Sequence, residues 1–361
     1  MKSIKICSVI GARPQFIKSA PLSKHFKKNN IEEVIIHTGQ HYDPNMSNIF
    51  FDQLNIPREK YNLNINQLSH GAMTGRMIEK IEEILLLESP DFVLVYGDTN
   101  STLAAAVAAV KQNVKIIHVE AGLRSFNRRM PEEINRVLTD NISDILFCPS
   151  KESVKNLKKE GIDNQTASIQ IVGDVMKDTI KLFSKDNLPN SEDISDILVT
   201  IHREENITSR NKLGEIVDGL NQLSREFKII LPLHPSTKKR IKEHNLELEF
   251  NVAEPFGFLE MIKKIKGTKL VITDSGGLQK EAYYLEKPSL VIRDQTEWIE
   301  LLEGGVNTLC PAKGSDIFDA TKRKLNENYR FLKSIYGKGS TSEKIVKSLV
   351  DYKKIMREEN Y

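Results

Sequence analysis

The chain has 361 residues, which is enough for two domains of ordinary size. Apolar residues make up 39% and charged residues 28%, as in ordinary globular proteins, and the net charge of +3 is too small to indicate nucleic acid or a membrane surface as the main partner. No apolar run approaches the roughly 20 residues of a membrane span, and the first apolar run is too short for a signal peptide, so we expect a cytoplasmic protein.

The three cysteines, Cys7, Cys148 and Cys310, are scattered along the chain. There is no CxxC pair and no cluster of Cys with His. A disulfide framework and a structural zinc site are therefore not expected.

The first half alternates short apolar runs with helical segments. The expected strands cover residues 4–10, 33–37, 92–96, 115–119, 145–148 and 169–172. One expected helix follows the turn at 11–18 and ends near 28, and others begin near 69, 101, 132 and 151. This alternation is typical of βαβ units and predicts a parallel sheet. The segment 69–87 is amphipathic, and we expect its Met and Leu positions to lie in the core.

A glycine turn follows the first strand, in the sequence GARPQFIK at 11–18. Such a turn can place backbone N–H groups beside an anion at the helix N-terminus, and Arg13 and Lys18 would add positive charge. A plain βα loop with solvated cations is an equally good interpretation, because the turn lacks a full GxGxxG pattern.

Two later strands each end at an acid, Asp98 after residues 92–96 and Glu120 after 115–119. Parallel strands end on the same side of a sheet, where ligands of open α/β sheets bind. The next helix begins at Pro131, and Glu132 in its first turn is expected to face the same crevice. The sequence therefore predicts a site of three acids, surrounded by Arg124, Arg128 and Arg129.

The second half repeats this logic after a polar segment at 184–196 that we interpret as a linker. Strands are expected at 197–201, 227–233, 269–273 and 289–292, and polar residues follow each strand at its carboxyl end. We predict two doubly wound α/β domains facing a cleft. Residues 1–175 form the first and 176–340 the second, and a helix in 341–361 packs back on the first.

The glycines of the second half are its most informative feature. Ser275-Gly276-Gly277 begins a helix, where glycines let a phosphate approach backbone N–H groups. Glu281 on that helix could bind two ribose hydroxyls, and Arg293 could hold phosphate with its fork of donors. The competing interpretation is a glycine-rich turn with a solvated Glu and a surface salt bridge.

Two histidines, His202 and His234, follow apolar strands in equivalent positions. A single such histidine is more often structural. Two beside one cleft favour a functional role.

With these residues in place, the chain resembles the non-hydrolysing UDP-N-acetylglucosamine 2-epimerase family over nearly its whole length. The motifs are GARPQFIK, YGDTNST at 96–102, HVEAGLRS at 118–125, PEEINR at 131–136, His202-Arg203, TDSGGLQKEA at 273–282 and the segment from Arg293. The resemblance implies two Rossmann-like domains, as in one large class of glycosyltransferases, together with a homodimer, no cofactor and no metal.

The resemblance also implies the reaction. UDP leaves as the C2 proton of a UDP-2-acetamido sugar is removed, and it adds back to the resulting 2-acetamidoglycal after reprotonation on the other face. Asp98, Glu120 and Glu132 match the family's catalytic acids, although which serves as acid and which as base is open. The residues implied to bind the UDP-sugar are Arg13, Lys18, His202, His234, Ser275, Gly276, Gly277, Glu281 and Arg293, with His202 also among the catalytic residues.

The loop after Arg293 departs from the family's usual T-E-R-P-E run. This version resembles the branch that acts on UDP-2,3-diacetamido-2,3-dideoxyglucuronate, a sugar of surface polysaccharides, and Arg128 or Arg129 could bind its carboxylate. Plain UDP-N-acetylglucosamine is the alternative substrate. Because of the same departure, the sequence does not decide whether the family's regulatory UDP-N-acetylglucosamine site is present. Gln40 and His41 would contact or line that site.

Three other functions fit parts of the pattern. A glycosyltransferase of the same architecture needs no base for C2, a hydrolysing epimerase would release free UDP, and a non-catalytic sensor would not need all three acids. The acid set favours the epimerase over each of them.

Overall fold

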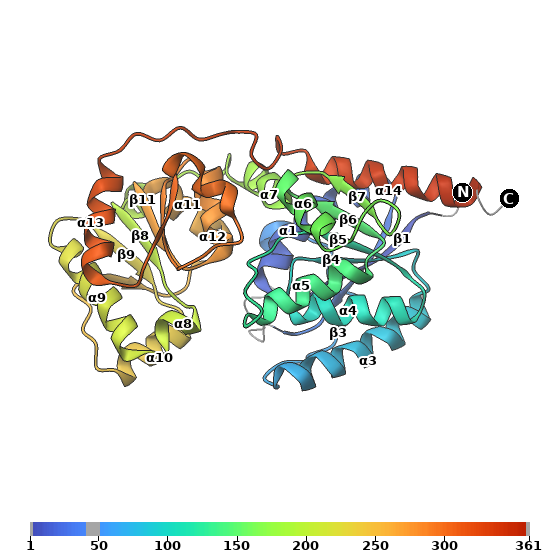
Figure 1. Ribbon diagram of the computed structural model, residues 1–361, viewed down its shortest axis with the longest axis horizontal. Helices are drawn as coiled ribbons and strands as arrows, with labels where there is room; N and C mark the ends of the chain where they lie inside the picture. The colour runs from blue at the N-terminus through green and yellow to red at the C-terminus, as the bar shows by residue number, and fades with distance from the viewer. Residues whose placement is uncertain (1–2, 41–50, 359–361) are drawn as a thin grey trace. The chain divides into compact units, whose positions relative to one another are not determined.

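The structure, a computed structural model, describes residues 3–40 and 51–358. The chain forms two compact units, one of Met1–Thr179 with Tyr336–Tyr361 and the other of Ile180–Ile335. We describe each unit separately and call them the first and second unit (Figure 1).

The first unit is built on a seven-stranded parallel sheet with the order β3-β2-β1-β4-β5-β6-β7. Its strands are β1 Lys5–Ile10, β2 Glu32–His37, β3 Tyr61–Asn62, β4 Phe92–Tyr96, β5 Lys115–Val119, β6 Ile145–Cys148 and β7 Ser168–Ile171. Its helices are α1 Arg13–Lys28, α3 His70–Glu88, α4 Asn100–Lys111, α5 Pro131–Ile142, α6 Lys151–Lys159 and α14 Thr341–Glu358.

The second unit carries a six-stranded parallel sheet with the order β10-β9-β8-β11-β12-β13. Its strands are β8 Ile197–Thr200, β9 Ile229–Pro232, β10 Asn251–Ala253, β11 Leu270–Thr273, β12 Ser289–Ile292 and β13 Asn307–Cys310. Its helices are α8 Glu204–Ile207, α9 Arg210–Ser224, α10 Pro235–Glu243, α11 Phe258–Gly267, α12 Gly276–Tyr284 and α13 Gly314–Leu325, with short 3-10 turns η1 Ser191–Asp193 and η2 Ile299–Gly305.

Both sheets are doubly wound, and this confirms the predicted fold class. In each, the strand order reverses beside the first strand, between β1 and β4 and between β8 and β11. Ligands of open α/β sheets bind outside the carboxyl ends of strands at such switch points. The predicted site residues that follow these four strands therefore lie where the topology favours binding.

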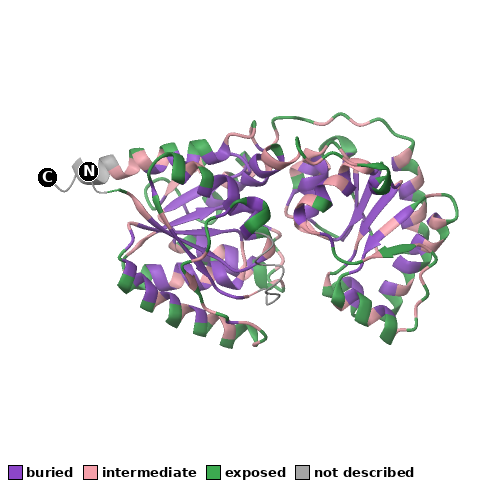
Figure 2. Cartoon of the chain, turned by 180° about the vertical axis from the view of Figure 1, so that it is seen from behind, coloured by how far each residue is buried: buried purple, intermediate pink, exposed green. Residues whose placement is uncertain are grey.

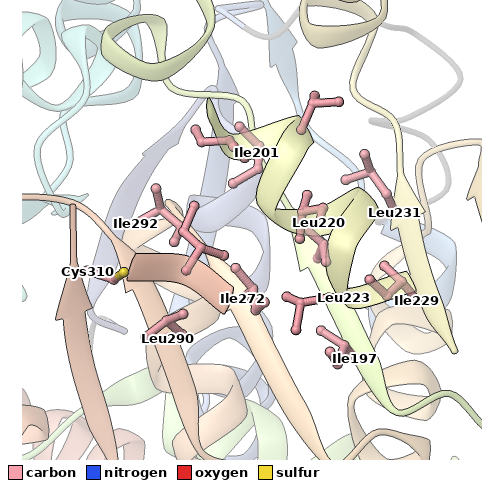
Figure 3. Packing of buried hydrophobic residues seen from close by; sticks show 14 of the residues in the cluster. Ile197, Ile201, Leu220, Leu223, Ile229, Leu231, Ile272, Leu290, Ile292 and Cys310 are labelled. Atoms are coloured by element: carbon pink, nitrogen blue, oxygen red, sulfur yellow. The ribbon is translucent and has the colours of Figure 1, made fainter. Parts of the chain in front are cut away.

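Strand side chains alternate between the two helical layers of each unit. In the second unit, Ile197 and Val199 face the cluster formed with α9 and α13, whereas Leu198 packs with α11 and α12. Figure 3 shows part of the first of these clusters, with Leu220 and Leu223 of α9 against strand residues. The inner strands are buried, the edge strands β3, β7 and β10 are partly exposed, and the helices expose mainly their outer sides (Figure 2), as expected for sheets covered on both faces.

The C-terminal helix α14 packs against the first unit. Its first residue, Thr341, donates its backbone N–H to Asp178, and the ring of Tyr352 lies 6.0 Å from that of Phe92. Lys353 further along α14 forms an ion pair with Asp91, just before β4. These contacts place the last helix on the sheet formed by the beginning of the chain.

Two details differ from the sequence predictions. The chain leaves the first unit within α7, Val175–Phe183, so the polar segment 184–196 belongs to the second unit. On α3, Leu85 is buried, but Leu86 and Leu87 are 63% and 72% exposed, although all Leu positions of this segment were predicted to lie in the core. Successive residues of a helix point about 100° apart, so three consecutive leucines cannot all face one sheet.

The three cysteines are buried and free. Burial raises the pKa of the Cys7 thiol to about 12 and that of Cys310 to about 11. Among the described residues, no helix is both long enough and apolar enough to cross a membrane.

The end of α3 is fastened to the sheet by Glu88, whose side chain is 4% exposed. Lys5 and Lys60 each place Nζ 2.7 Å from its carboxylate, and the Tyr61 hydroxyl donates to it. Burial, the largest single effect, raises the pKa of Glu88, but the hydrogen bonds from Lys5, Lys60 and Tyr61 outweigh it and lower the pKa to about 2.

We predict that Glu88→Gln destabilises the protein at neutral pH. Because the pKa is lower in the folded state than in the unfolded state, the carboxylate stabilises the fold above about pH 4.5 and loses this effect as the pH falls towards 2. The variant should lose up to about 3 kcal/mol of unfolding free energy at pH 7 and much less at pH 3. Urea unfolding at both pH values measures this, with the exposed Glu83→Gln on the same helix as a control expected to change little. An equal loss for Glu88→Gln at both pH values would contradict the prediction.

Candidate active site

The carboxyl ends of β4 and β5 lie side by side in the sheet. Tyr96 pairs with Val119 at the last position of the two strands, and the backbone N–H of Gly97 donates to the Val119 carbonyl at 3.0 Å. Asp98 and Glu120 therefore leave the same edge of the sheet, as the sequence predicted.

Glu120 forms a buried ion pair with a residue from α1. Its Oε1 lies 2.7 Å from Lys18 Nζ, and the two side chains are only 8% and 9% exposed. A Cβ on Gly97 would lie 3.4 Å from Lys18 Nζ and 3.7 Å from Glu120 Oε1, so the turn after β4 lies directly against this pair. Lys18, predicted to contact phosphate, thus contacts one of the three acids.

Asp98 is held by α5. Its Oδ2 lies 2.6 Å from Nη2 of Arg136, which is nearly buried, and its backbone carbonyl accepts a hydrogen bond from Asn135 Nδ2 at 3.0 Å. The Asp98 side chain keeps 30% exposure. This carboxylate is therefore oriented by the protein and still open to a ligand.

The paired acids at the start of α5 have different environments. Glu132 is exposed in the first turn, one turn before Arg136, whose Nε donates to the Glu132 carbonyl. Glu133 is 2% exposed, and its carboxylate accepts hydrogen bonds from the backbone N–H groups of Ser125 and Phe126. Glu132 is the acid available to a ligand, and Glu133 shapes the loop before the helix.

The glycine turn after β1 does not present the open donors that its sequence suggests. Gln15 Oε1 accepts hydrogen bonds from the N–H groups of Gly11 and Ala12, at 2.8 and 3.0 Å. A Cβ on Gly11 would lie only 1.9 Å from Thr38 Oγ1. The glycine is therefore required for packing, and Gln15 occupies the donors that an anion would use.

The arginines predicted around the acids, together with Arg13, which was predicted to bind phosphate, separate into two groups. Arg13 at the start of α1 is half-buried, and Arg128 and Arg129 are exposed in the loop before α5. Arg124 was expected in the site, but its guanidinium is buried and contacts Asp140 at 2.6 Å and Glu160 at 2.6 Å. Arg124 is a structural residue, and that expectation was wrong.

In the second unit, the predicted phosphate-binding residues lie together at the start of α12. Ser275 is the N-cap, and its Oγ accepts from the Leu278 N–H. The N–H groups of Gly276 and Gly277 point out of the first turn and have no acceptor among the described residues. Glu281, one turn further on, is buried, with Oε1 3.8 Å from a Cβ built on Gly277.

Arg293 brings its guanidinium to this helix end. Its side chain is 2% exposed, and Nη1 would lie 3.8 Å from a Cβ on Gly276 and has no hydrogen-bond acceptor among the described residues. Nη2 pairs with Glu297 at 2.9 Å. Glu297 also lies at the helix start, since a Cβ on Gly276 would lie 2.5 Å from its Oε1. The Nη1 side of Arg293 and the helix N-terminus remain as groups that favour an anionic ligand at this position.

Asp274 organises the neighbouring turn after β8. It is fully buried and accepts hydrogen bonds from the backbone N–H groups of His202 and Arg203. The His202 ring is 40% exposed and lies 5.9 Å from the His234 ring, so the two predicted histidines lie together. His234 Nδ1 accepts from the backbone N–H of Ser236, which leaves Nε2 as the nitrogen that carries a proton.

Two residues named for a regulatory site have different outcomes. Gln40 Oε1 accepts from the backbone N–H and the hydroxyl of Ser101, at 3.0 and 2.7 Å, at the start of α4. His41 lies outside the described residues. Within residues 3–40 and 51–358, no three His, Cys, Asp or Glu side chains are grouped to hold a metal.

Sequence reasoning missed several residues that shape both sites. Arg136 and His118 belong to motifs quoted above, but nothing in their spacing assigned them partners. Asp140, Asp274 and Glu297 were missed because their contacts join elements that are far apart in the chain. A polar residue within or directly after a buried apolar run is the one signal that could have drawn attention to His118 and Asp274.

Comparison with known proteins gives a consistent result. The family model described as UDP-N-acetylglucosamine 2-epimerase matches residues 24–350. The UDP-2,3-diacetamido-2,3-dideoxy-D-glucuronate 2-epimerase of Pseudomonas aeruginosa is 48% identical, covering 96% of this chain and 99% of its own. A UDP-N-acetylglucosamine 2-epimerase homolog of Methanococcus maripaludis is also 48% identical, with the same coverage.

A solved structure is similar over the whole fold. The Methanocaldococcus jannaschii UDP-GlcNAc 2-epimerase, in complex with UDP-GlcNAc and UDP, is 41% identical with a TM-score of 0.89. The match covers 96% of this chain and 99% of that one.

We predict that Arg293→Gln weakens the binding of inorganic pyrophosphate at least about tenfold, because a charge-assisted hydrogen bond contributes about 1.5–3 kcal/mol. Isothermal titration calorimetry measures this. Arg225→Gln, which changes an exposed arginine directly after α9, is the matched control and should bind like the parent protein. Unchanged affinity in Arg293→Gln would mean that the α12 end is not the anion site.

Proposed function

The chain belongs to the UDP-N-acetylglucosamine 2-epimerase family, and we propose that its substrate is UDP-2,3-diacetamido-2,3-dideoxy-glucuronate. The enzyme is a non-hydrolysing UDP-sugar 2-epimerase, which is an isomerase. The 48% identity to the Pseudomonas aeruginosa enzyme over nearly the whole chain supports this substrate. UDP-N-acetylglucosamine is the alternative, supported by equal identity to the Methanococcus maripaludis homolog.

The observation that carries the mechanism is the pair of acids at the ends of β4 and β5. Removal of a C2 proton requires a positioned base, because that proton is barely acidic. Asp98 and Glu120 lie at adjacent strand ends, each with one cation, Arg136 and Lys18 respectively. Neither is therefore an isolated charge, and both can be held in place for proton transfer.

The proposed reaction is an elimination followed by an addition. One carboxylate takes the C2 proton as the C1–O bond to UDP breaks, which gives a 2-acetamidoglycal and UDP. A protonated carboxyl group then returns a proton to C2 from the opposite face while UDP adds back to C1. Asp98, Glu120 and Glu132 are the proposed proton carriers, and their assignment to acid and base stays open.

Departure of UDP requires stabilisation of the charge that develops on its phosphate. The α12 end supplies the N–H groups of Gly276 and Gly277, the helix dipole and the Arg293 guanidinium. We assign His202 and His234 to the same leaving group, with Arg13 as a further cation. Glu281 is positioned on α12 to accept hydrogen bonds from ribose hydroxyls.

The carboxylate of the proposed sugar requires a cation that UDP-N-acetylglucosamine does not need. Arg128 and Arg129 are exposed in the loop that leads into α5, the helix that carries Glu132 and Arg136. A guanidinium matches a carboxylate with two parallel hydrogen bonds. We assign recognition of the substrate carboxylate to this loop.

We predict that Asp98→Asn slows exchange of the C2 hydrogen with solvent by about 10²–10⁴-fold, since it removes a group that transfers a proton. Proton NMR of the UDP-sugar in D2O measures this exchange. The affinity for UDP should stay within about twofold, because the amide keeps the shape of the site, and the exposed Asp186→Asn should behave like the parent protein. Full exchange in Asp98→Asn would show that this acid is not catalytic.

We also predict a substrate preference. In parallel assays, kcat/KM should be at least about tenfold higher for UDP-2,3-diacetamido-glucuronate than for UDP-N-acetylglucosamine, which corresponds to about 1.4 kcal/mol of transition-state binding. Replacement of Arg128 and Arg129 by Ala should reduce this ratio, mainly by lowering kcat/KM for the charged sugar.

Two outcomes of the parallel assays would change the proposal. Higher kcat/KM for UDP-N-acetylglucosamine would select the alternative substrate. Formation of a glycosidic product without inversion at C2 would indicate a glycosyltransferase instead, and free UDP in stoichiometric amounts at equilibrium would indicate a hydrolysing enzyme.

A further inference from the structure

A buried carboxylate, Asp140 on α5, connects the turns that carry the proposed catalytic acids. Its side chain is fully buried. Oδ1 lies 2.7 Å from His118 Nδ1, and Oδ2 accepts from Gly122 N–H at 3.1 Å and from Arg124 Nη1 at 2.6 Å. Three donors from β5 and the loop after it therefore converge on one side chain of a helix.

His118, on β5, extends this connection to the turn after β4. Its Nε2 lies 2.7 Å from the Gly97 carbonyl oxygen, and the ring is fully buried. A carbonyl oxygen can only accept a hydrogen bond, so Nε2 is the nitrogen that donates to Gly97. His118 thus bridges Asp140 and the residue before Asp98.

The ionised form of Asp140 is consistent with its surroundings. Burial, the largest single effect, raises the pKa of Asp140, but His118 and Arg124 outweigh it and the pKa is lowered. Glu160 pairs with the other side of the Arg124 guanidinium. The Arg124 guanidinium therefore contacts two carboxylates, Asp140 and Glu160, which lowers the cost of burying them.

Both turns that Asp140 holds have unusual backbone conformations. Gly97 has φ of +64° and Gly122 of +78°, and Glu120 has φ of +76°, in the left-handed region that non-glycine residues rarely adopt. Such a conformation persists only where surrounding contacts require it, and it is concentrated at functional sites. A Cβ on Gly122 would lie 2.4 Å from the Ser153 carbonyl oxygen, so this turn has no room to relax on that side.

The same helix also carries the third acid. Glu132 lies in the first turn of α5 and Arg136 one turn later, where it pairs with Asp98. Asp140 follows after one further turn. A displacement of α5 relative to the sheet would therefore move Glu132 and the partner of Asp98 together.

We propose that His118 and Asp140 are positioning residues. The bond from His118 to the Gly97 carbonyl holds the turn that bears Asp98, and Asp140 holds the Gly122 turn after Glu120 to the helix that bears Glu132. The proposal rests on the proposed function, because C2 chemistry is what this alignment serves. Neither residue contacts substrate in this scheme. A buried contact between charged or polar groups, such as that of His118 with Asp140, does not by itself show that the pair stabilises the fold. The bond from His118 to the Gly97 carbonyl gives this contact a specific geometric role.

Two substitutions at His118 separate its two hydrogen bonds. The amide nitrogen of Asn can occupy the position of Nδ1, so His118→Asn keeps the bond to Asp140 and loses the bond to Gly97. The amide nitrogen of Gln can occupy the position of Nε2, so His118→Gln keeps the bond to Gly97 and loses the bond to Asp140. The two variants remove the same ring, and each is the control for the other.

We expect kcat for C2 exchange to fall about a hundredfold in His118→Asn, as for an ångström-scale misplacement of a catalytic group, and by less than about tenfold in His118→Gln. KM and the affinity for UDP should be similar in both variants, as should their thermal midpoints. Parent-like kcat in His118→Asn, or equal losses in the two variants, would overturn the proposal.

Two further measurements do not depend on activity. Nitrogen-15 NMR of the parent protein should show a proton on Nε2 of His118, and an Nε2 without a proton would overturn the proposal. Crystal structures should show the Gly97–Asp98 turn displaced from Arg136 in His118→Asn but not in His118→Gln. If the parent protein shows these features yet exchanges no C2 hydrogen on either UDP-sugar, the proposed function fails and the positioning role remains.

Discussion

The parallel pairing of β4 with β5 is the constraint on which the proposed chemistry depends. It places Tyr96 opposite Val119, so the two strands end together and their next residues enter one region. Asp98 and Glu120 are 22 positions apart in the chain, and both follow the ends of these two adjacent strands. The helix between them, α4, is rich in Ala and buried along much of its length, which lets the crossover pack closely on both strands.

Each unit fixes its ligand-facing turns with a buried carboxylate that accepts backbone N–H groups. In the second unit, Asp274 holds the turn of His202 and Arg203. In the first, Asp140 holds Gly122 directly and Gly97 through His118. Charge-assisted hydrogen bonds of this kind are short and directional, so they determine the conformation of loops whose residues have little regular structure.

Most charged residues near the two sites have a partner of opposite sign. Lys18 pairs with Glu120, Arg136 with Asp98 and Arg293 with Glu297. These pairs reduce the cost of burying charge before a ligand arrives. A diphosphate at the α12 end would offer Arg293 a second anion, on the Nη1 side where it has no acceptor within the described part of the chain.

Much of the architecture could be read from the sequence. The bounds of β4, β5, β6 and β12 coincide with the predicted ranges, because each is a short, mostly apolar segment followed by polar or turn residues. The carboxyl-end position of Asp98, Glu120, His202 and Ser275 followed from the same pattern, since parallel strands end on one side. These predictions needed only local information along the chain.

Only the tertiary structure decided which side chain meets which. Arg124 was expected beside the acids and instead pairs with Asp140, while Arg136 pairs with Asp98. Of two adjacent acids, Glu132 is exposed and Glu133 is buried, and Gln15 occupies the N–H groups that the glycine turn seemed to offer an anion. Neighbouring residues on a helix or loop point in different directions, and their partners come from elements far away in sequence, so composition and spacing carry no information about these choices.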